Sequence, residues 1–271
     1  MAPMRHRRFA PLLRLACLAA LGATLGVAIA SGARAQEVVR IEERQFKAGA
    51  GRITFSEVPM GTPNPVYPPS RYRGGPDSPT VRFGGHFRGR RLGTQAECPP
   101  GAPVTGCLAG APSAPLTLDA GAPRVETMDN AGVRGSQSPE LGGTPRWNGP
   151  IAIWFDRDLA AVGLQGGWFD GTGGVAITVY DRQGKVLGRT ANRGTGFEFM
   201  GLATRDLSPR IAGLEFHLVG DEPQGFGVDN IRFGAPQEID LPGVTPPAPQ
   251  PPPPPPPPPA PPAPRRPPIL P

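Results

Sequence analysis

The residues with the clearest potential for chemistry are three tryptophans, because a flat indole face can stack on the apolar face of a sugar ring. They are Trp147, Trp154 and Trp168. Trp168 stands within residues 166–174, where glycines are frequent, and glycine lets a backbone approach a ligand closely. Asp170 in the same segment could bind a cation or sugar hydroxyls. These four residues are therefore the candidate ligand-binding set.

A structural interpretation of the same residues stays open. Trp168 could cover the open end of a β-sandwich as part of its core, and Trp154 could pack across two neighbouring strands. Asp170 would then be an ordinary solvated acid in a turn. The sequence does not decide between these uses.

Catalytic patterns are absent from the sequence. It contains no Gly-x-Ser-x-Gly, no Walker loop and no His-Glu-x-x-His, and the only histidines beyond residue 35 are His86 and His217. His217 lies in a strand pattern, which is typical of an outward-facing or hydrogen-bonded histidine. Asp170 and Glu198 could serve as the two carboxylates of a glycoside hydrolase, but acids are plentiful in this chain. We therefore expect no catalytic residues and a protein that is not an enzyme.

Two cysteines beyond the first 35 residues predict a disulfide. Cys98 and Cys107 enclose eight residues rich in proline and glycine. An even cysteine count in an exported protein favours a local disulfide, and closing so short a loop stabilises a fold by about 2 to 3 kcal/mol at most. The alternative is a metal pair, but no histidine stands at a zinc-like spacing from these cysteines.

The second half of the chain has the pattern of an all-β protein. Apolar and polar residues alternate in short runs, turn residues recur at intervals of about 8 to 12 residues, and no long helical period occurs. This predicts an antiparallel β-sandwich. The expected strands are 151–155, 160–165, 174–180, 185–189, 196–200, 211–219 and 226–233. Asp181 to Gly184 predict a tight hairpin turn in which the glycine supplies a positive φ.

The closing strand, 226–233, breaks its own alternation. Phe226 and Val228 fall on one face of an extended chain, and Ile231 and Phe233 fall on the other. One extra residue near Asp229, a β-bulge, would return all four apolar side chains to the core face and redirect the carboxylate.

The first half of the chain is less regular. A strand is expected at 52–58, ended by Pro59, with Ile53, Phe55 and Glu57 on one face, and another at 80–87. Residues 36–47 are compatible with a short helix or an edge strand. The regular core of the sandwich is expected over 53–234.

Three motifs carry a resemblance to a known family. They are Ile53 to Glu57, Val175 to Gly184 and Gly225 to Ile231. They resemble the exported jelly-roll domains of bacterial PEP-CTERM sorting-signal proteins and, more distantly, carbohydrate-binding jelly rolls that end in an aromatic-x-Ile-Asp-Asp-Val strand. The resemblance implies a jelly-roll-like sandwich over 53–234. The sequence departs from the family in its last residues, where a proline-rich segment replaces the Pro-Glu-Pro anchor.

The resemblance also implies a possible structural calcium. In carbohydrate-binding jelly rolls an acid of the first strand and one of the last often share such an ion, and the matching positions are Glu57 and Asp229. Two carboxylates with loop carbonyls could supply the six to eight oxygens that calcium prefers. The alternative is that Asp229 accepts hydrogen bonds from backbone amides of the bulge and binds no metal.

The two ends of the chain differ from the body. Residues 1–35 predict a signal peptide, with a basic start, an apolar run over 15–30 and Ala33-Arg34-Ala35 as the cleavage site. This predicts export to the periplasm or beyond. Residues 245–271 hold 18 of the 40 prolines and predict a stiff, disordered tail. The β-sandwich domain is then 36–244, and no later segment is long and apolar enough to span a membrane.

Charge separates the body from its ends. Five of the 28 basic residues lie in the leader and two in the tail, which leaves 21 against 22 acids and a net charge of −1. We therefore expect no nucleic-acid partner. The sequence favours an exported, non-catalytic protein that binds glycan or another envelope or matrix component. The alternatives are a structural or tethering module that acts through its proline tail and, less favoured, a glycoside hydrolase.

Overall fold

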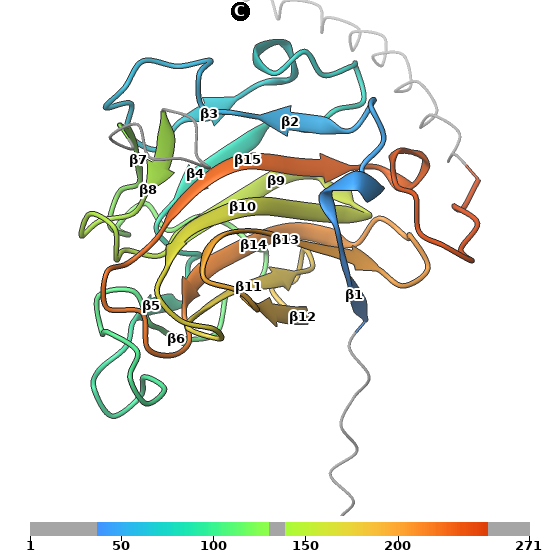
Figure 1. Cartoon of the computed structure of the whole chain (residues 1–271). Coiled ribbons are helices and arrows are strands. Elements are labelled where there is room, and N and C mark those ends of the chain that lie inside the picture. The colour runs from blue at the N-terminus through green and yellow to red at the C-terminus, as the bar shows by residue number, and fades with distance from the viewer. Residues whose placement is uncertain (1–36, 130–138, 249–271) are drawn as a thin grey trace, which may run out of the picture. The chain divides into compact units, whose positions relative to one another are not determined.

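A computed structural model of the chain describes residues 37–129 and 139–248 (Figure 1). The predicted signal peptide at 1–35 and residues 249–271 of the predicted tail at 245–271 lie outside the described residues, so both stay predictions. Among the described residues, no helix has the length and apolar character that crossing a membrane requires.

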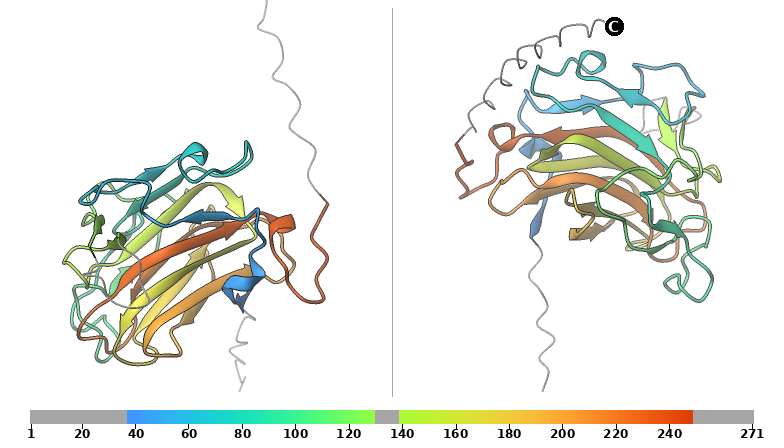
Figure 2. Two further views of the ribbon diagram at one scale, coloured as in Figure 1. Left: turned by 45° about the horizontal axis from the view of Figure 1, so that its top comes forward. Right: turned by 180° about the vertical axis from the view of Figure 1, so that it is seen from behind.

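The described residues form an antiparallel β-sandwich of two large sheets, as the sequence predicts (Figures 1 and 2). The seven-stranded sheet has the order β1 (Val38–Ile41), β13 (Gly196–Thr204), β10 (Ala161–Phe169), β15 (Gly227–Gly234), β8 (Glu140–Gly142) and β7 (Glu126–Met128), and β2 (Gly51–Ile53) also pairs with β15. The six-stranded sheet has the order β12 (Val186–Ala191), β11 (Val175–Tyr180), β14 (Ile211–Leu218), β9 (Ile151–Leu159), β4 (Val81–Gly84) and β3 (Val66–Tyr67). A two-stranded sheet joins β5 (Arg90–Leu92) to β6 (Leu108–Gly110).

All seven strands predicted between 151 and 233 are present, from β9 to β15. The predicted hairpin joins β11 to β12. Gly184 has φ +78°, and the Asp181 carboxylate accepts hydrogen bonds from the backbone N–H groups of Gln183 and Lys185. Both alternatives for residues 36–47 are partly realised, because the edge strand β1 is followed by a 3-10 turn at Glu43–Gln45.

Aromatic side chains from the two sheets meet in the core. The ring of Phe155 on β9 lies 5.6 Å from that of Phe233 on β15, and the ring of Phe216 on β14 lies 4.7 Å from that of Phe226. Each of these side chains is at most 1% exposed. Burying a side chain of this size stabilises a fold by about 1.5 to 3 kcal/mol, so this layer joins the sheets.

The predicted bulge in the closing strand is confirmed. Gly163 of β10 pairs with Arg232, whereas Gln165 pairs with Asp229, so β15 carries one extra residue in this interval. Asn230 takes φ +45° there. All four apolar side chains of the strand are consequently buried in the same core cluster. The Asp229 side chain is also buried, and it accepts a 2.7 Å hydrogen bond from the Asn230 N–H.

The predicted opening strand at 52–58 is wrong in its extent. β2 ends at Ile53, and Phe55 takes φ +61°, which turns the chain away from the sheet. Glu57 therefore lies in a turn, where its carboxylate accepts hydrogen bonds from the Thr54 N–H and hydroxyl at 3.2 and 3.0 Å. The alternation of residue types does not reveal a left-handed residue, so the strand pattern continued past the true end.

The predicted disulfide is present. Cys98 and Cys107 are bonded, with their Cα atoms 5.8 Å apart. The bond closes the loop between β5 and β6, and Cys107 packs with the main core.

Candidate ligand-binding sites

Two of the three tryptophans line one pocket, called here the tryptophan pocket. Trp147, Trp168 and Gln224 line this pocket, which has a volume of about 310 Å³. The indole rings of Trp147 and Trp168 lie 5.8 Å apart and are tilted by 60°. Phe197 lies 5.5 Å from Trp168 on β13, so the three rings form one aromatic cluster. Both indoles are only partly buried.

Both tryptophans have a backbone conformation that bulky residues rarely adopt. Their φ angles are +69° at Trp147 and +76° at Trp168. Such a residue costs about 1 to 3 kcal/mol and persists only where the surroundings enforce it. Trp168, expected in a glycine-rich loop, lies on β10. There β10 has one residue more than β13 between two paired positions, which forms a bulge that redirects the side chain.

The segment that follows Gln224 holds Trp147 in place. The Phe226 N–H donates a 2.6 Å hydrogen bond to the Trp147 carbonyl oxygen. Gly225 approaches the same carbonyl so closely that an added Cβ would lie 1.8 Å from the oxygen, and its φ is +90°. Only glycine fits at this crossing.

A pair of acids supports the edge of the tryptophan pocket. Asp170 is exposed, and its carboxylate accepts hydrogen bonds from the Gln224 N–H and side-chain amide at 3.2 and 3.1 Å. Glu222 is fully buried and accepts a 2.9 Å hydrogen bond from the Asp170 N–H. Burial and, to a smaller extent, the neighbouring Asp170 charge raise the pKa of Glu222 to about 7.

Residue type and spacing indicated Trp147, Trp168 and Asp170 but did not indicate Glu222 and Gln224. These two belong to the segment 221–225, which has the composition of an ordinary solvated turn. Glu222 precedes a proline just before the closing strand, which indicates a turn but not a buried acid. Nothing in the spacing indicated that its carboxyl group is buried.

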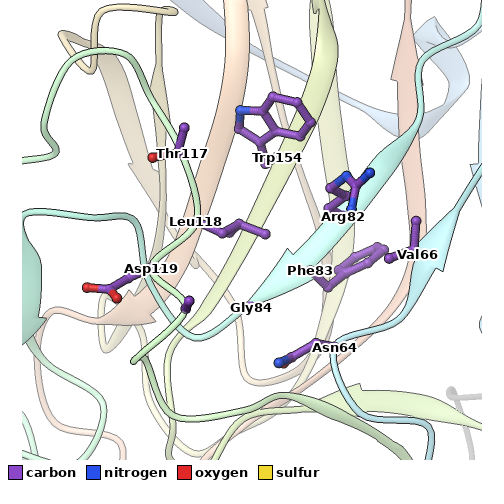
Figure 3. Close-up of a pocket in the computed structure, with 10 residues that line it drawn as sticks. Asn64, Val66, Arg82, Phe83, Gly84, Thr117, Leu118, Asp119 and Trp154 are labelled. Carbon is purple, nitrogen blue, oxygen red and sulfur yellow. The ribbon is translucent and has the colours of Figure 1, made fainter.

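Trp154 lies elsewhere, in a groove on the six-stranded sheet (Figure 3). The groove has a volume of about 530 Å³ and is mostly apolar. Arg82 of β4 pairs with Trp154 of β9, and Figure 3 shows Leu118 pointing toward these strands from the loop that faces them, while Asp119 points away. The Trp154 indole N–H donates a 2.8 Å hydrogen bond to the Leu116 carbonyl, and the Arg182 guanidinium lies 5.4 Å from the ring centroid. Trp154 is thus well partnered within the protein.

A buried polar network lies on the same sheet. Glu215 of β14 is 0% exposed, and its carboxylate accepts hydrogen bonds from the Tyr180 hydroxyl at 2.7 Å and from Arg90 at 3.0 Å. His217, two residues further on, contacts Thr178 at 3.2 Å. Burial, and after it the charge of Arg90, lowers the pKa of His217 to about 3. The structure thus makes His217 a buried, hydrogen-bonded residue, one of the two alternatives from the sequence.

Glu57 and Asp229 each accept hydrogen bonds from residues close to them in the chain. Glu57 binds Thr54, whereas Asp229 binds the N–H and side chain of Asn230. Within residues 37–129 and 139–248, no group of three or more His, Cys, Asp or Glu side chains is placed to hold a metal. The pocket that contains Glu57 is also lined by three arginines, which oppose a cation there. The calcium site stays a prediction from the resemblance.

Asp170 and Glu198, the imagined hydrolase pair, have separate partners. Glu198 forms an ion pair with Arg40 and accepts hydrogen bonds from the N–H groups of Arg193 and Gly194. Asp170 binds Gln224 and Glu222 instead.

Comparison with known proteins does not assign this chain to a family. No protein-family model matches the chain, and no curated protein matches it as a relative.

Proposed function

We propose that this chain is an exported, non-catalytic β-sandwich that binds a glycan or another envelope or matrix component through the tryptophan pocket. The observation that carries the proposal is the pair of strained indoles. Two bulky residues in left-handed conformations, with rings 5.8 Å apart, face a pocket of about 310 Å³. Backbone strain concentrates at functional sites, where the surrounding structure enforces it.

The chemistry of the pocket suits a sugar. Indole faces stack on the C–H face of a pyranose, and hydrogen-bonding groups at the rim bind its hydroxyls. Gln224 is exposed, and the Asp170 carboxylate holds it in place. An amide and a carboxylate at the edge of an aromatic surface together offer both donors and acceptors to a sugar.

The acids beside the pocket support binding rather than hydrolysis. Glycoside hydrolases hold their two carboxyl groups at least about 5 Å apart, so that a sugar carbon or a water molecule fits between them. Glu222 is fully buried and its two oxygens accept hydrogen bonds from the Asp170 N–H, so its carboxyl group is not open to a sugar. We infer that this pair fixes the loop that carries Gln224.

Export is part of the same proposal. The leader pattern at 1–35 supports it, and the Cys98–Cys107 disulfide is typical of a protein that folds in an oxidising compartment. These two features support periplasmic or extracellular localisation.

Binding to a glycan array and to insoluble wall polysaccharides tests the proposal. Trp168→Ala should weaken retention at least tenfold, which corresponds to about 1.4 kcal/mol of binding free energy. Gln224→Ala should weaken it less. Trp154→Ala is the matched control, since it removes an indole from outside the tryptophan pocket and should leave retention unchanged. Retention equal in wild type and Trp168→Ala, or absent from both, would remove the glycan-binding proposal.

A further inference from the structure

We propose a second binding site, specific for a carboxylate or phosphate group, in a pocket lined by three arginines. This arginine pocket has a volume of about 490 Å³ and is lined by Arg52, Thr54, Glu57, Arg71, Tyr72 and Arg73. It shares no lining residue with the tryptophan pocket, and its function does not depend on the glycan-binding proposal.

The three guanidinium groups come from two segments that the fold brings together. Arg52 lies on β2, and its side chain donates a 2.7 Å hydrogen bond to Asn230, the left-handed residue of the β15 bulge. Arg71 ends the 3-10 turn Pro69–Arg71, donates a 2.6 Å hydrogen bond to the Val66 carbonyl and lies 5.8 Å from the Tyr67 ring centroid. Two of the three cations are thus held in position without a ligand.

The positive charge of the arginine pocket is poorly balanced within the protein. Arg52 and Arg71 donate only to neutral oxygens, and neither forms an ion pair within the described residues. Arg73 makes no hydrogen bond or ion pair with any residue in the part of the chain that the structure describes. Arg73 is exposed and takes φ +60°, so its placement is set by a strained turn rather than by a partner.

Glu57 is the only acid among the lining residues. One of its oxygens accepts hydrogen bonds from Thr54, and the other is buried without a partner among the described residues. The Tyr67 hydroxyl, also buried, lacks a partner in the same range. A single carboxylate does not neutralise three guanidinium groups, so the arginine pocket keeps an excess of positive charge.

The chemistry of arginine defines the ligand. The planar guanidinium donates two parallel hydrogen bonds to a carboxylate or phosphate, and such charge-assisted pairs are among the strongest hydrogen bonds in proteins. A volume of about 490 Å³ exceeds that of one anionic group and leaves room for an attached ring. The ligand class is therefore an organic anion with a carboxylate or phosphate group on a ring-sized body, for which a uronate and a sugar phosphate are suitable probes.

Calorimetric titration of the full chain with glucuronate, glucose 6-phosphate and neutral glucose tests this inference. We expect one or both anions to bind and glucose not to bind. The stronger of the two anions then identifies the ligand as carboxylate or phosphate. Raising the salt concentration should weaken the interaction, because exposed charges are screened.

Arg73→Gly is the decisive variant, because glycine adopts a positive φ without strain and the substitution removes one cation. It should weaken anion binding at least tenfold. Arg88→Ala is the matched control: Arg88 is also exposed, lies outside the arginine pocket, and should bind the anions as wild type does. Trp168→Ala should also leave anion binding unchanged, so the two proposals fail independently.

Three results would overturn the inference. They are the absence of binding by both anions, affinity unchanged in Arg73→Gly, and an equal loss in Arg88→Ala, which would indicate attraction by surface charge alone. Thermal melting of each variant shows whether a lost affinity comes from a lost fold.

Discussion

The tryptophan pocket and the Trp154 groove both contain tryptophan side chains, but the backbone conformation and the hydrogen bonds of these residues differ. Trp154 occupies a regular strand position, donates its indole N–H to the Leu116 carbonyl and lies against Arg182. Trp147 and Trp168 have left-handed backbones, and the indole N–H of Trp168 reaches its acceptor, Glu140, only at 3.4 Å. An aromatic surface is therefore a weak indicator of a site by itself. The way the backbone and the polar atoms are held separates the well-partnered Trp154 from the two tryptophans proposed to bind a ligand.

The polar groups near the two regions also differ, in their burial and in their partners. On the Trp154 side of the molecule, Glu215 and His217 of β14 are buried and hydrogen-bonded to neighbours within the sheet and its covering loop. Beside the tryptophan pocket, Asp170 and Gln224 are exposed and contact each other. Substitutions should therefore affect stability in the first region and binding in the second.

Glu215→Ala should produce the largest loss of stability. The substitution leaves the Arg90 guanidinium and the Tyr180 hydroxyl without their acceptor in a buried site, and breaking such a pair costs about 3 to 5 kcal/mol. Chemical denaturation measures the free energy of unfolding. Asp170→Ala is the comparison at the tryptophan pocket, where an exposed acid should cost less than about 1 kcal/mol. Equal losses in the two variants would contradict the division between the regions.

His217 should make the protein sensitive to acid. Its pKa is about 3 in the folded protein against an ordinary value of 6.5, so the unfolded chain binds a proton that the native state does not. Stability should therefore fall as the pH decreases from about 6.5 toward 3, by at most about 1.4 kcal/mol per pH unit. His217→Gln should flatten this part of the stability curve. A curve with the same slope in the variant would show that other groups cause the acid sensitivity.

Glu222 should make the protein less stable as the pH rises, which is opposite to the effect of His217. Its pKa is about 7 in the folded protein against an ordinary value of 4.5, so the native state keeps a proton that the unfolded chain releases. This contribution to stability is complete below about pH 4.5 and is lost as the pH rises through about 7. Glu222→Gln should remove the dependence on pH in this window. Stability of wild type that rises between pH 5 and 7.5, after subtraction of the His217 effect, would contradict the raised pKa.

Replacing the indole of Trp154 or Trp168 by a phenyl ring should give the smallest change in the free energy of unfolding. Trp154→Phe loses the 2.8 Å hydrogen bond to Leu116 and should cost about 1 to 2 kcal/mol. Trp168→Phe loses only a 3.4 Å contact with Glu140 and should cost less than about 1 kcal/mol. Denaturation of both variants in one buffer provides the measurement. A reversed order would show that Trp168 is the structural residue.

The strands of the second half were predictable because each one buries a face against the core, and this requirement fixes the residue type at every second position. The bulge at Asp229 and Asn230 was predictable for the same reason, since four apolar residues had to reach one face. The hairpin at Asp181 to Gly184 followed from local turn chemistry.

The parts that sequence reasoning missed depend on conformation or on distant contacts. The left-handed φ of Phe55 ends β2 early, and that of Trp168 forms a bulge, yet neither residue type signals such a backbone. The buried Glu222 accepts hydrogen bonds from the Asp170 N–H, which is 52 positions away in the chain. The arginine pocket joins β2 to the turn at 71–73, which are separated by a proline-rich loop without periodicity.

The central position of the last strand decides when this chain can fold. β15 pairs with β10 on one side and with β2 and β8 on the other, and the Arg52–Asn230 contact joins residues 178 positions apart. Before residue 234 emerges from the ribosome, the seven-stranded sheet lacks the strand that connects its two halves. Contacts between such distant segments form slowly, because a long loop must close first. The nascent chain therefore stays open to chaperones and proteases until residue 234 has been synthesised and β15 can pair.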